Sequence, residues 1–80
     1  MKRVHVQYFA MLREQARCAE ESVATSAGTP AALYRELAGR HGFTLPPERA
    51  RVALDGEFAA WDAPLRDGVR LAFIPPFAGG

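Results

Sequence analysis

Residues 29–42 read Thr-Pro-Ala-Ala-Leu-Tyr-Arg-Glu-Leu-Ala-Gly-Arg-His-Gly, and this stretch decides the fold. Thr29 can accept a hydrogen bond from the first free amides of a helix, and Pro30 at the first helical position loses no needed donor. Apolar side chains then recur at three- and four-residue spacing, and Gly42 supplies the C-terminal cap position. The pattern predicts one helix of about a dozen residues.

Two alternating segments precede this helix. Residues 3–9 alternate with period two, which predicts a half-buried strand, and residues 20–25 form a weaker alternating run. The charged start of the second run suits an edge strand, because charges on an edge discourage pairing with other chains. Between them, residues 10–17 contain strong helix formers and predict one or two helical turns with Leu12 pointing inward.

Three further strands are expected after the helix. Residues 51–54 and 57–60 flank Asp55-Gly56, a dipeptide that suits the positive φ angles of a hairpin turn. A second Asp-Gly pair, residues 67–68, precedes the strongest strand, residues 69–74. With one helix between two sets of strands, the order predicts an α+β domain whose sheet packs on the helix.

Composition limits the classes of protein that remain. With 80 residues, 49% of them hydrophobic, the chain provides for one domain, residues 1–80, with one core. Cys18 is the one cysteine, so no internal disulfide, cysteine-based zinc site or iron–sulfur cluster is expected, which fits a reducing compartment. Residues 1–6 alternate rather than forming an apolar run, so we expect no signal peptide or membrane span and a cytoplasmic location. A net charge of +1 gives no basic footprint for nucleic acid or a membrane surface.

The last six residues, 75–80, read Pro-Pro-Phe-Ala-Gly-Gly. Two prolines fix φ and favour an extended tail, whose six residues reach at most about 20 Å. Gly79 and Gly80 lack a Cβ, so a narrow channel can close around their backbone. This arrangement indicates that the terminal carboxylate of Gly80 is the reactive group, whereas a frayed end with accidental glycines is the simpler alternative.

Three segments resemble one known family. The end Phe-Ile-Pro-Pro-Phe-Ala-Gly-Gly, residues 73–80, looks like the carboxyl end of MoaD-type proteins, the small sulfur-carrier subunits of molybdopterin synthase. Tyr-Phe-Ala-Met-Leu-Arg-Glu, residues 8–14, is similar to that family's segment after the first strand. Pro-Leu-Arg-Asp-Gly, residues 64–68, is similar to its Pro-Leu-x-Asp-Gly turn. Length and element order agree over the whole chain.

The resemblance implies a ubiquitin-like β-grasp fold: a mixed sheet of about five strands on one main helix, with a flexible C-terminal Gly-Gly tail. It also implies that a ubiquitin-activating-like adenylating enzyme consumes ATP to activate Gly80, which a sulfur donor converts to a thiocarboxylate. The tail would then insert into the large synthase subunit, in a heterotetramer of two small and two large subunits, and pass sulfur to cyclic pyranopterin monophosphate.

The resemblance also assigns roles to residues. Gly80 would carry the acyl adenylate and then the thiocarboxylate. An apolar sheet face beside the tail would bind the partner through Phe9, Phe73 and Ile74. The residues expected to insert into the partner are Pro75, Pro76, Phe77, Ala78 and Gly79.

The sequence offers no assembled catalytic group of its own. A carboxylate is a poor electrophile and needs prior activation, yet nothing in the chain resembles a phosphate-binding loop, so the ATP site must belong to a partner. His5, His41 and Cys18 are expected to be structural, because no acid, base and nucleophile come together in the pattern. We therefore expect a carried substrate rather than a catalyst, with no bound cofactor or metal.

Two other functions stay open. The chain could be a sulfur carrier for thiazole, cysteine or transfer-RNA thiolation, or a protein modifier that joins its glycine to lysines through an isopeptide bond. Covalent conjugates in cells would favour the modifier, and a free thiocarboxylate would favour a carrier. A β-grasp electron carrier is excluded, since one cysteine cannot hold an iron–sulfur cluster.

Overall fold

The computed structural model describes residues 1–76, and the expected flexible tail, residues 77–80, lies outside the described residues. The chain begins with strand β1 (Lys2–Tyr8), helix α1 (Ala10–Ala16) and strand β2 (Glu20–Thr25). Helix α2 (Pro30–His41) and a 3-10 turn (Pro47–Arg49) follow. Strands β3 (Arg51–Leu54), β4 (Glu57–Ala59) and β5 (Arg70–Ile74) complete the domain. None of the helices in residues 1–76 is long and apolar enough to cross a membrane.

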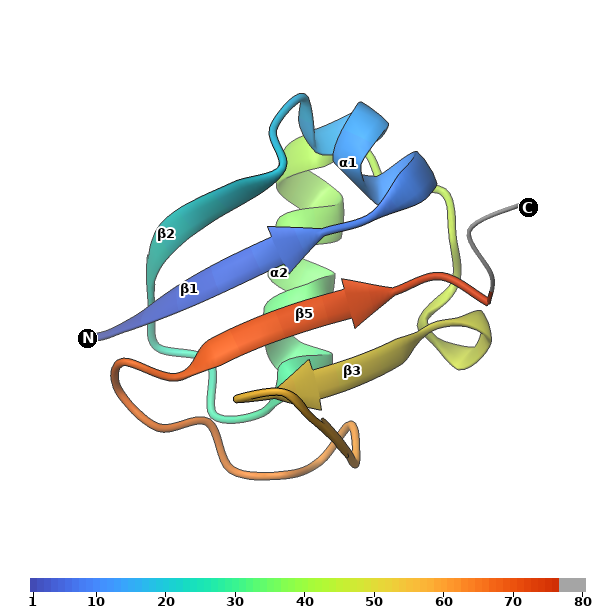
Figure 1. Cartoon of the computed structure of the whole chain (residues 1–80). Helices are drawn as coiled ribbons and strands as arrows, with labels where there is room; N and C mark the ends of the chain where they lie inside the picture. The colour runs from blue at the N-terminus through green and yellow to red at the C-terminus, as the bar shows by residue number, and fades with distance from the viewer. Residues whose placement is uncertain (77–80) are drawn as a thin grey trace.

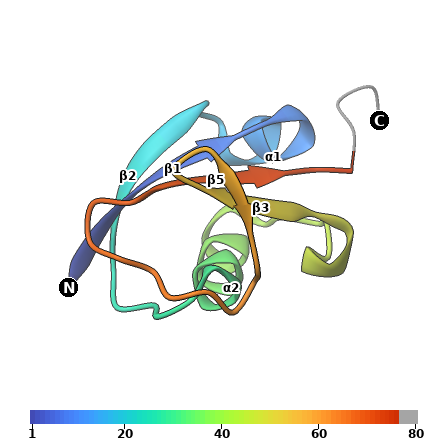
Figure 2. The same ribbon diagram turned by 60° about the horizontal axis from the view of Figure 1, so that its bottom comes forward.

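The strands form one mixed sheet in the order β2-β1-β5-β3-β4. β1 and β5 run parallel, with Tyr8 beside Phe73, and every other pairing is antiparallel. Helix α2 lies across one face of the sheet, and the opposite face carries no helix of the described chain (Figure 1, Figure 2). The expected edge strand at residues 20–25 is confirmed as β2, at one end of the sheet.

The predicted limits of α2 are confirmed. The Thr29 side chain accepts a hydrogen bond from the amide of Ala32 at 3.2 Å, and Pro30 occupies the first turn. Gly42 adopts a left-handed φ of 75°, which a residue with a side chain adopts only with strain, and its amide bonds back to the carbonyl of Ala38. These local signals fix where the helix begins and ends.

The core lies between α2 and the sheet. Alternation along β1 buries Val4, Val6 and Tyr8, and β5 buries Leu71 and Phe73 on the same side. An aromatic group joins the two layers. The Tyr34 ring of α2 stands edge-on to Phe73 at 5.0 Å between centroids, and Trp61 stacks on Phe73 at 5.8 Å. Phe73 is therefore a central residue of the core.

The predicted hairpin is also present. Asp55 and Gly56 both have positive φ angles, 50° and 86°, as a two-residue turn between β3 and β4 requires. Pro46 precedes the 3-10 turn and Pro47 begins it, because proline is well accommodated in a first helical turn.

Candidate functional site at the end of β5

The candidate site begins where β5 ends. β5 lies between β1 and β3, so strands on both sides hold its backbone and the root of the tail is fixed. Pro75 is buried and Pro76 is exposed. The insertion of Pro75 and Pro76 into a partner stays a prediction; the exposed Pro76 is the more accessible of the two in the isolated chain. The roles expected for Phe77, Ala78, Gly79 and Gly80 lie outside the described residues.

A shallow groove lies beside the tail root. Arg51 of β3 pairs in register with Ile74, and its guanidinium lies over the ring of Phe58 on β4, 5.3 Å from the ring centroid. A cation–π contact at such an exposed site contributes about 0.5–1 kcal/mol. It helps to hold Phe58 in place although 66% of that side chain is exposed. The groove is lined by Glu48, Arg49, Ala50, Arg51, Phe58, Ile74, Pro75 and Pro76.

The three expected partner-binding residues separate into two groups. Phe9 is 45% exposed and Ile74 is partly exposed, so both stand at the surface as the expectation requires, and their contact with a partner stays a prediction. Phe73 is 0% exposed. Its assignment as a partner-binding residue is wrong, because Phe73 lies beside Tyr8 and Val52, which both face α2.

The structure explains the roles of Phe9 and Leu12 in the segment that follows β1. Phe9 is extended and sits just before α1, and its carbonyl accepts a hydrogen bond from the Leu12 amide at 3.1 Å. Leu12 is fully buried, as predicted, and this orientation leaves the Phe9 side chain at the surface.

The Asp67-Gly68 turn joins the start of β1 to the chain that leads into β5. The Arg3 amide donates to Asp67 Oδ1 at 2.8 Å, and the Gly68 amide donates to the Arg3 carbonyl at 2.7 Å. Gly68 has a φ of 83°, which explains the glycine. This turn therefore sets the position of β5 and, through it, the place where the tail leaves the domain.

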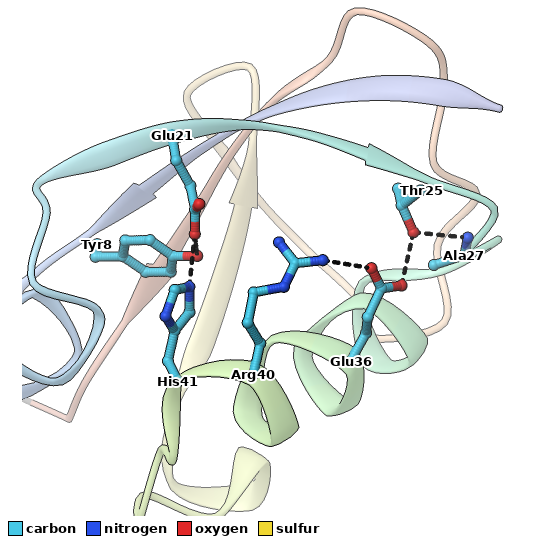
Figure 3. Close-up of polar contacts among 7 residues, drawn as sticks. All are labelled: Tyr8, Glu21, Thr25, Ala27, Glu36, Arg40 and His41. Carbon is cyan, nitrogen blue, oxygen red and sulfur yellow. Dashed lines mark hydrogen bonds and ion pairs between the residues drawn. The ribbon is translucent and has the colours of Figure 1, made fainter.

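A polar cluster between β1, β2 and α2 was not predicted. Tyr8 Oη donates to Glu21 Oε2 at 2.5 Å, and His41 Nε2 lies 2.7 Å from the same oxygen (Figure 3). Burial, then the hydrogen bond to Glu21, raises the pKa of the Tyr8 phenol far above its ordinary value. Burial alone would raise the pKa of Glu21, but the hydrogen bonds from Tyr8 and His41 outweigh it and lower that pKa. The cluster connects β1, β2 and the end of α2.

A second polar connection lies beside this cluster. The Thr25 hydroxyl donates to Glu36 Oε1 at 2.8 Å and accepts from the Ala27 amide at 3.0 Å, and Arg40 lies 3.5 Å from the other oxygen of Glu36 (Figure 3). Thr25 is buried, so these bonds satisfy a hydroxyl that would otherwise be costly inside the domain. Both polar groups hold β2 on α2 and lie outside the candidate site.

The lowered pKa of Glu21 should make the free energy of unfolding depend on pH. A carboxyl whose pKa is lowered by folding adds stability above its unfolded pKa, near 4.5, and loses it as the pH falls through the folded value. We expect Glu21→Gln to lower the free energy of unfolding at pH 7 by about 1 kcal/mol, and we expect the difference to shrink at about pH 3. Urea unfolding at both pH values measures this. Glu14→Gln, on the exposed side of α1, should match the wild type at both; an equal loss for Glu21→Gln at both pH values would contradict the assignment.

The remaining candidate groups show no catalytic arrangement. His5 Nε2 lies 2.6 Å from Glu20 Oε1 on the sheet face opposite α2. Burial, with a contribution from Glu21, raises the pKa of the Cys18 thiol, so the reactive thiolate is disfavoured. Within residues 1–76, no three His, Cys, Asp or Glu side chains are grouped to hold a metal ion.

The arrangement of one mixed sheet on one main helix, with a central last strand leading to the chain end, defines a ubiquitin-like β-grasp domain. The ThiS family model matches residues 6–80. The chain therefore belongs to the ThiS family, and it has the fold of the ThiS/MoaD sulfur carriers. Among curated proteins, no sequence matches it significantly.

Solved structures resemble the chain over nearly its whole length. A putative molybdopterin converting factor subunit 1 from Pyrococcus furiosus is 28% identical, with a TM-score of 0.81, covering 96% of this chain and 100% of that one. SAMP1, a small archaeal modifier protein of Haloferax volcanii, is 26% identical with a TM-score of 0.76, covering 98% and 99%. In a complex of subunits 1 and 2 of the molybdopterin-converting factor from Helicobacter pylori, the matching chain is 22% identical with a TM-score of 0.67, covering 98% and 99%. The known relatives thus include both a converting-factor subunit and a modifier.

Proposed function

We propose that this protein is the sulfur carrier of molybdenum cofactor biosynthesis, the small subunit of a molybdopterin synthase. One observation carries the proposal: the central strand β5 leads directly into a Pro-Pro-Phe-Ala-Gly-Gly end, in a chain whose fold matches a molybdopterin converting factor subunit 1. The fixed root gives the tail a defined exit from the domain. The Gly80 carboxylate then carries the chemistry.

The chemistry divides between this chain and its partners. A Gly80 carboxylate oxygen attacks the α-phosphorus of ATP in a separate adenylating enzyme, and pyrophosphate leaves. Sulfur at the oxidation level of sulfide, supplied by a donor, attacks the activated carbonyl carbon and AMP leaves, so Gly80 becomes a thiocarboxylate. The thiocarboxylate sulfur next forms a bond to a carbon of cyclic pyranopterin monophosphate in the large subunit; water then hydrolyses the acyl carbon–sulfur bond, so the sulfur stays on the pterin as the start of the dithiolene and Gly80 returns to the carboxylate. This chain supplies no catalytic side chain and binds no cofactor of its own.

The partners follow from the same proposal. Two copies of this chain would join two large subunits in the cytoplasm, and each tail, residues 75–80, would enter a large subunit. The half-exposed Phe9 and Ile74 beside the tail root would contact the partner, with Phe58 and Arg51 adjoining them. This surface is apolar at its centre, as partner-binding surfaces often are.

Reconstitution tests the function. The protein is combined with the adenylating enzyme, ATP, a sulfur donor, the large subunit and cyclic pyranopterin monophosphate, and molybdopterin is measured. Intact-mass analysis of the carrier should show an oxygen-to-sulfur replacement located at Gly80. Absence of that replacement, with the adenylating enzyme active on a control carrier, would contradict the proposal.

A second candidate function has one supporting observation, the 26% identity to SAMP1. As a modifier, the chain would form an isopeptide bond from Gly80 to a lysine of another protein. Mass spectrometry of cellular proteins distinguishes the two functions. Gly80-linked peptides would favour the modifier, and a free thiocarboxylate without conjugates favours the carrier.

The exposed sheet face provides a mutational test of partner binding. We expect Ile74→Asp to keep the fold and to abolish measurable binding to the large subunit, because it places a charge in the apolar centre beside the tail root. Circular dichroism and calorimetric titration measure the two properties. Ser22→Asp adds the same charge on the same face, at the distant edge strand β2, and should bind normally. Unfolding of Ile74→Asp would instead show that Ile74 belongs to the core.

A further inference from the structure

The positive charge of this protein is almost entirely arginine. Nine of its ten cationic side chains are arginine, and Lys2 is the only lysine in the 80 residues. The two residues differ in chemistry as well as in shape. A lysine amine loses its proton near pH 10.4 and then attacks activated acyl carbons, whereas guanidinium stays protonated and delocalised at any physiological pH. The choice between them therefore matters for a protein whose own carboxyl end is activated.

Arginines stand where an amine would be most harmful. Arg49 and Arg51 line the groove that also contains Pro75 and Pro76 at the tail root. Residues 75–80 reach at most about 20 Å when extended, so both guanidinium groups lie within the length of the tail. An amine at either place would be tethered within reach of the activated Gly80, and a short flexible link gives an effective concentration on the order of millimolar.

The lysine lies at the other end of the sheet. β1 and β5 are parallel with Tyr8 beside Phe73, so Lys2, six residues before Tyr8 along β1, is about 20 Å from the end of β5. Figure 1 shows this separation: β1 starts at the left, and β5 ends at the right. Lys2 Nζ also donates to the Ala27 carbonyl at 2.7 Å. The α-amino group of Met1 lies next to Lys2, so both amines are far from the tail root.

We propose that the surface around the tail root is kept free of lysine so that the activated carboxyl end is not captured by an amine of its own chain. In that side reaction, the amine nitrogen would attack the Gly80 carbonyl carbon, the C–N bond would form, and AMP or a thiol would leave. The product would be a cyclic isopeptide that can no longer carry sulfur. The inference rests on the proposed function only in supposing that Gly80 is activated.

The test needs no partner enzyme, so its result is independent of the proposed function. The full chain is prepared with a C-terminal thioester by intein cleavage, and Arg51→Lys and Arg49→Lys are compared with the wild type at about pH 8. Arg3→Lys is the matched control, because it adds the same amine at the start of β1, beside Lys2. Intact mass distinguishes the hydrolysed chain from the cyclic chain, and peptide mapping locates the new bond.

We expect Arg51→Lys and Arg49→Lys to form the cyclic product at least about tenfold faster than the wild type and Arg3→Lys, which should end as free carboxylate. Circular dichroism checks that all four proteins are folded. Two results would overturn the inference: hydrolysis of both groove variants without cyclisation, or cyclisation of the wild type at the rate of the groove variants.

Discussion

We expect that one alanine added after Gly80 abolishes molybdopterin formation and leaves the melting temperature of the protein unchanged. The extension turns the reactive carboxylate of Gly80 into an ordinary peptide bond, which cannot be adenylated. The loss should be complete within the detection limit of the assay, because no other group of the chain is expected to carry sulfur. We expect no structural defect, since within the described residues 1–76 the core lies mainly in the strands and α2, well before the added residue.

Stability and activity therefore separate in this variant. The same alanine placed before Met1 is the matched control, because it changes the length equally and leaves the Gly80 carboxylate free. It should support full sulfur transfer. Melting is followed by circular dichroism, and sulfur transfer by the reconstituted assay. Full activity of the extended chain, with mass spectrometry showing that the alanine is still present, would refute a role for Gly80 as the carrier.

Local signals explain why much of the fold could be predicted. The caps of α2 and the hairpin turn at residues 55–56 depend on residues next to one another in sequence, and the structure confirms both. The parallel pairing of β1 with β5 joins segments more than sixty residues apart, with His5 opposite Arg70. Periodicity cannot specify such a pairing, and only the family resemblance implied a mixed sheet.

The candidate site, like the fold, could be predicted from the sequence only where it depends on residues close together in the chain. The unusual end was visible in the sequence, but the residues that support its root, Arg51 and Phe58, come from the β3–β4 hairpin and reach it only through pairing with β5. The Tyr8–Glu21–His41 cluster was missed because its members come from three elements. One signal was available: an inward-facing tyrosine needs a hydrogen-bond partner for its hydroxyl.

The assignment of Phe73 to a partner-binding surface was wrong, and the buried position of Phe73 predicts a large loss of stability when its ring is removed. Successive side chains of β5 alternate between the two faces of the sheet, so Phe73 is buried while Ile74 is partly exposed, and one face cannot present both to a partner. The Phe73 ring contacts Tyr34 and Trp61, which fill the space between the sheet and α2. The large ring serves the core rather than an interface.

We expect Phe73→Ala to lower the free energy of unfolding by about 3–5 kcal/mol, because it removes a fully buried ring and leaves a cavity beside two aromatic side chains. Small domains have only about 5–15 kcal/mol in total, so this variant should be partly unfolded at physiological temperature. Ile74→Ala, one residue further and on the open face, should cost about 1 kcal/mol or less. Urea unfolding of both variants measures the difference. If Phe73→Ala stays fully folded but binds the large subunit poorly, Phe73 belongs to the interface and not to the core. If both variants lose the same free energy of unfolding, Phe73 and Ile74 are equally buried, which would contradict the structure.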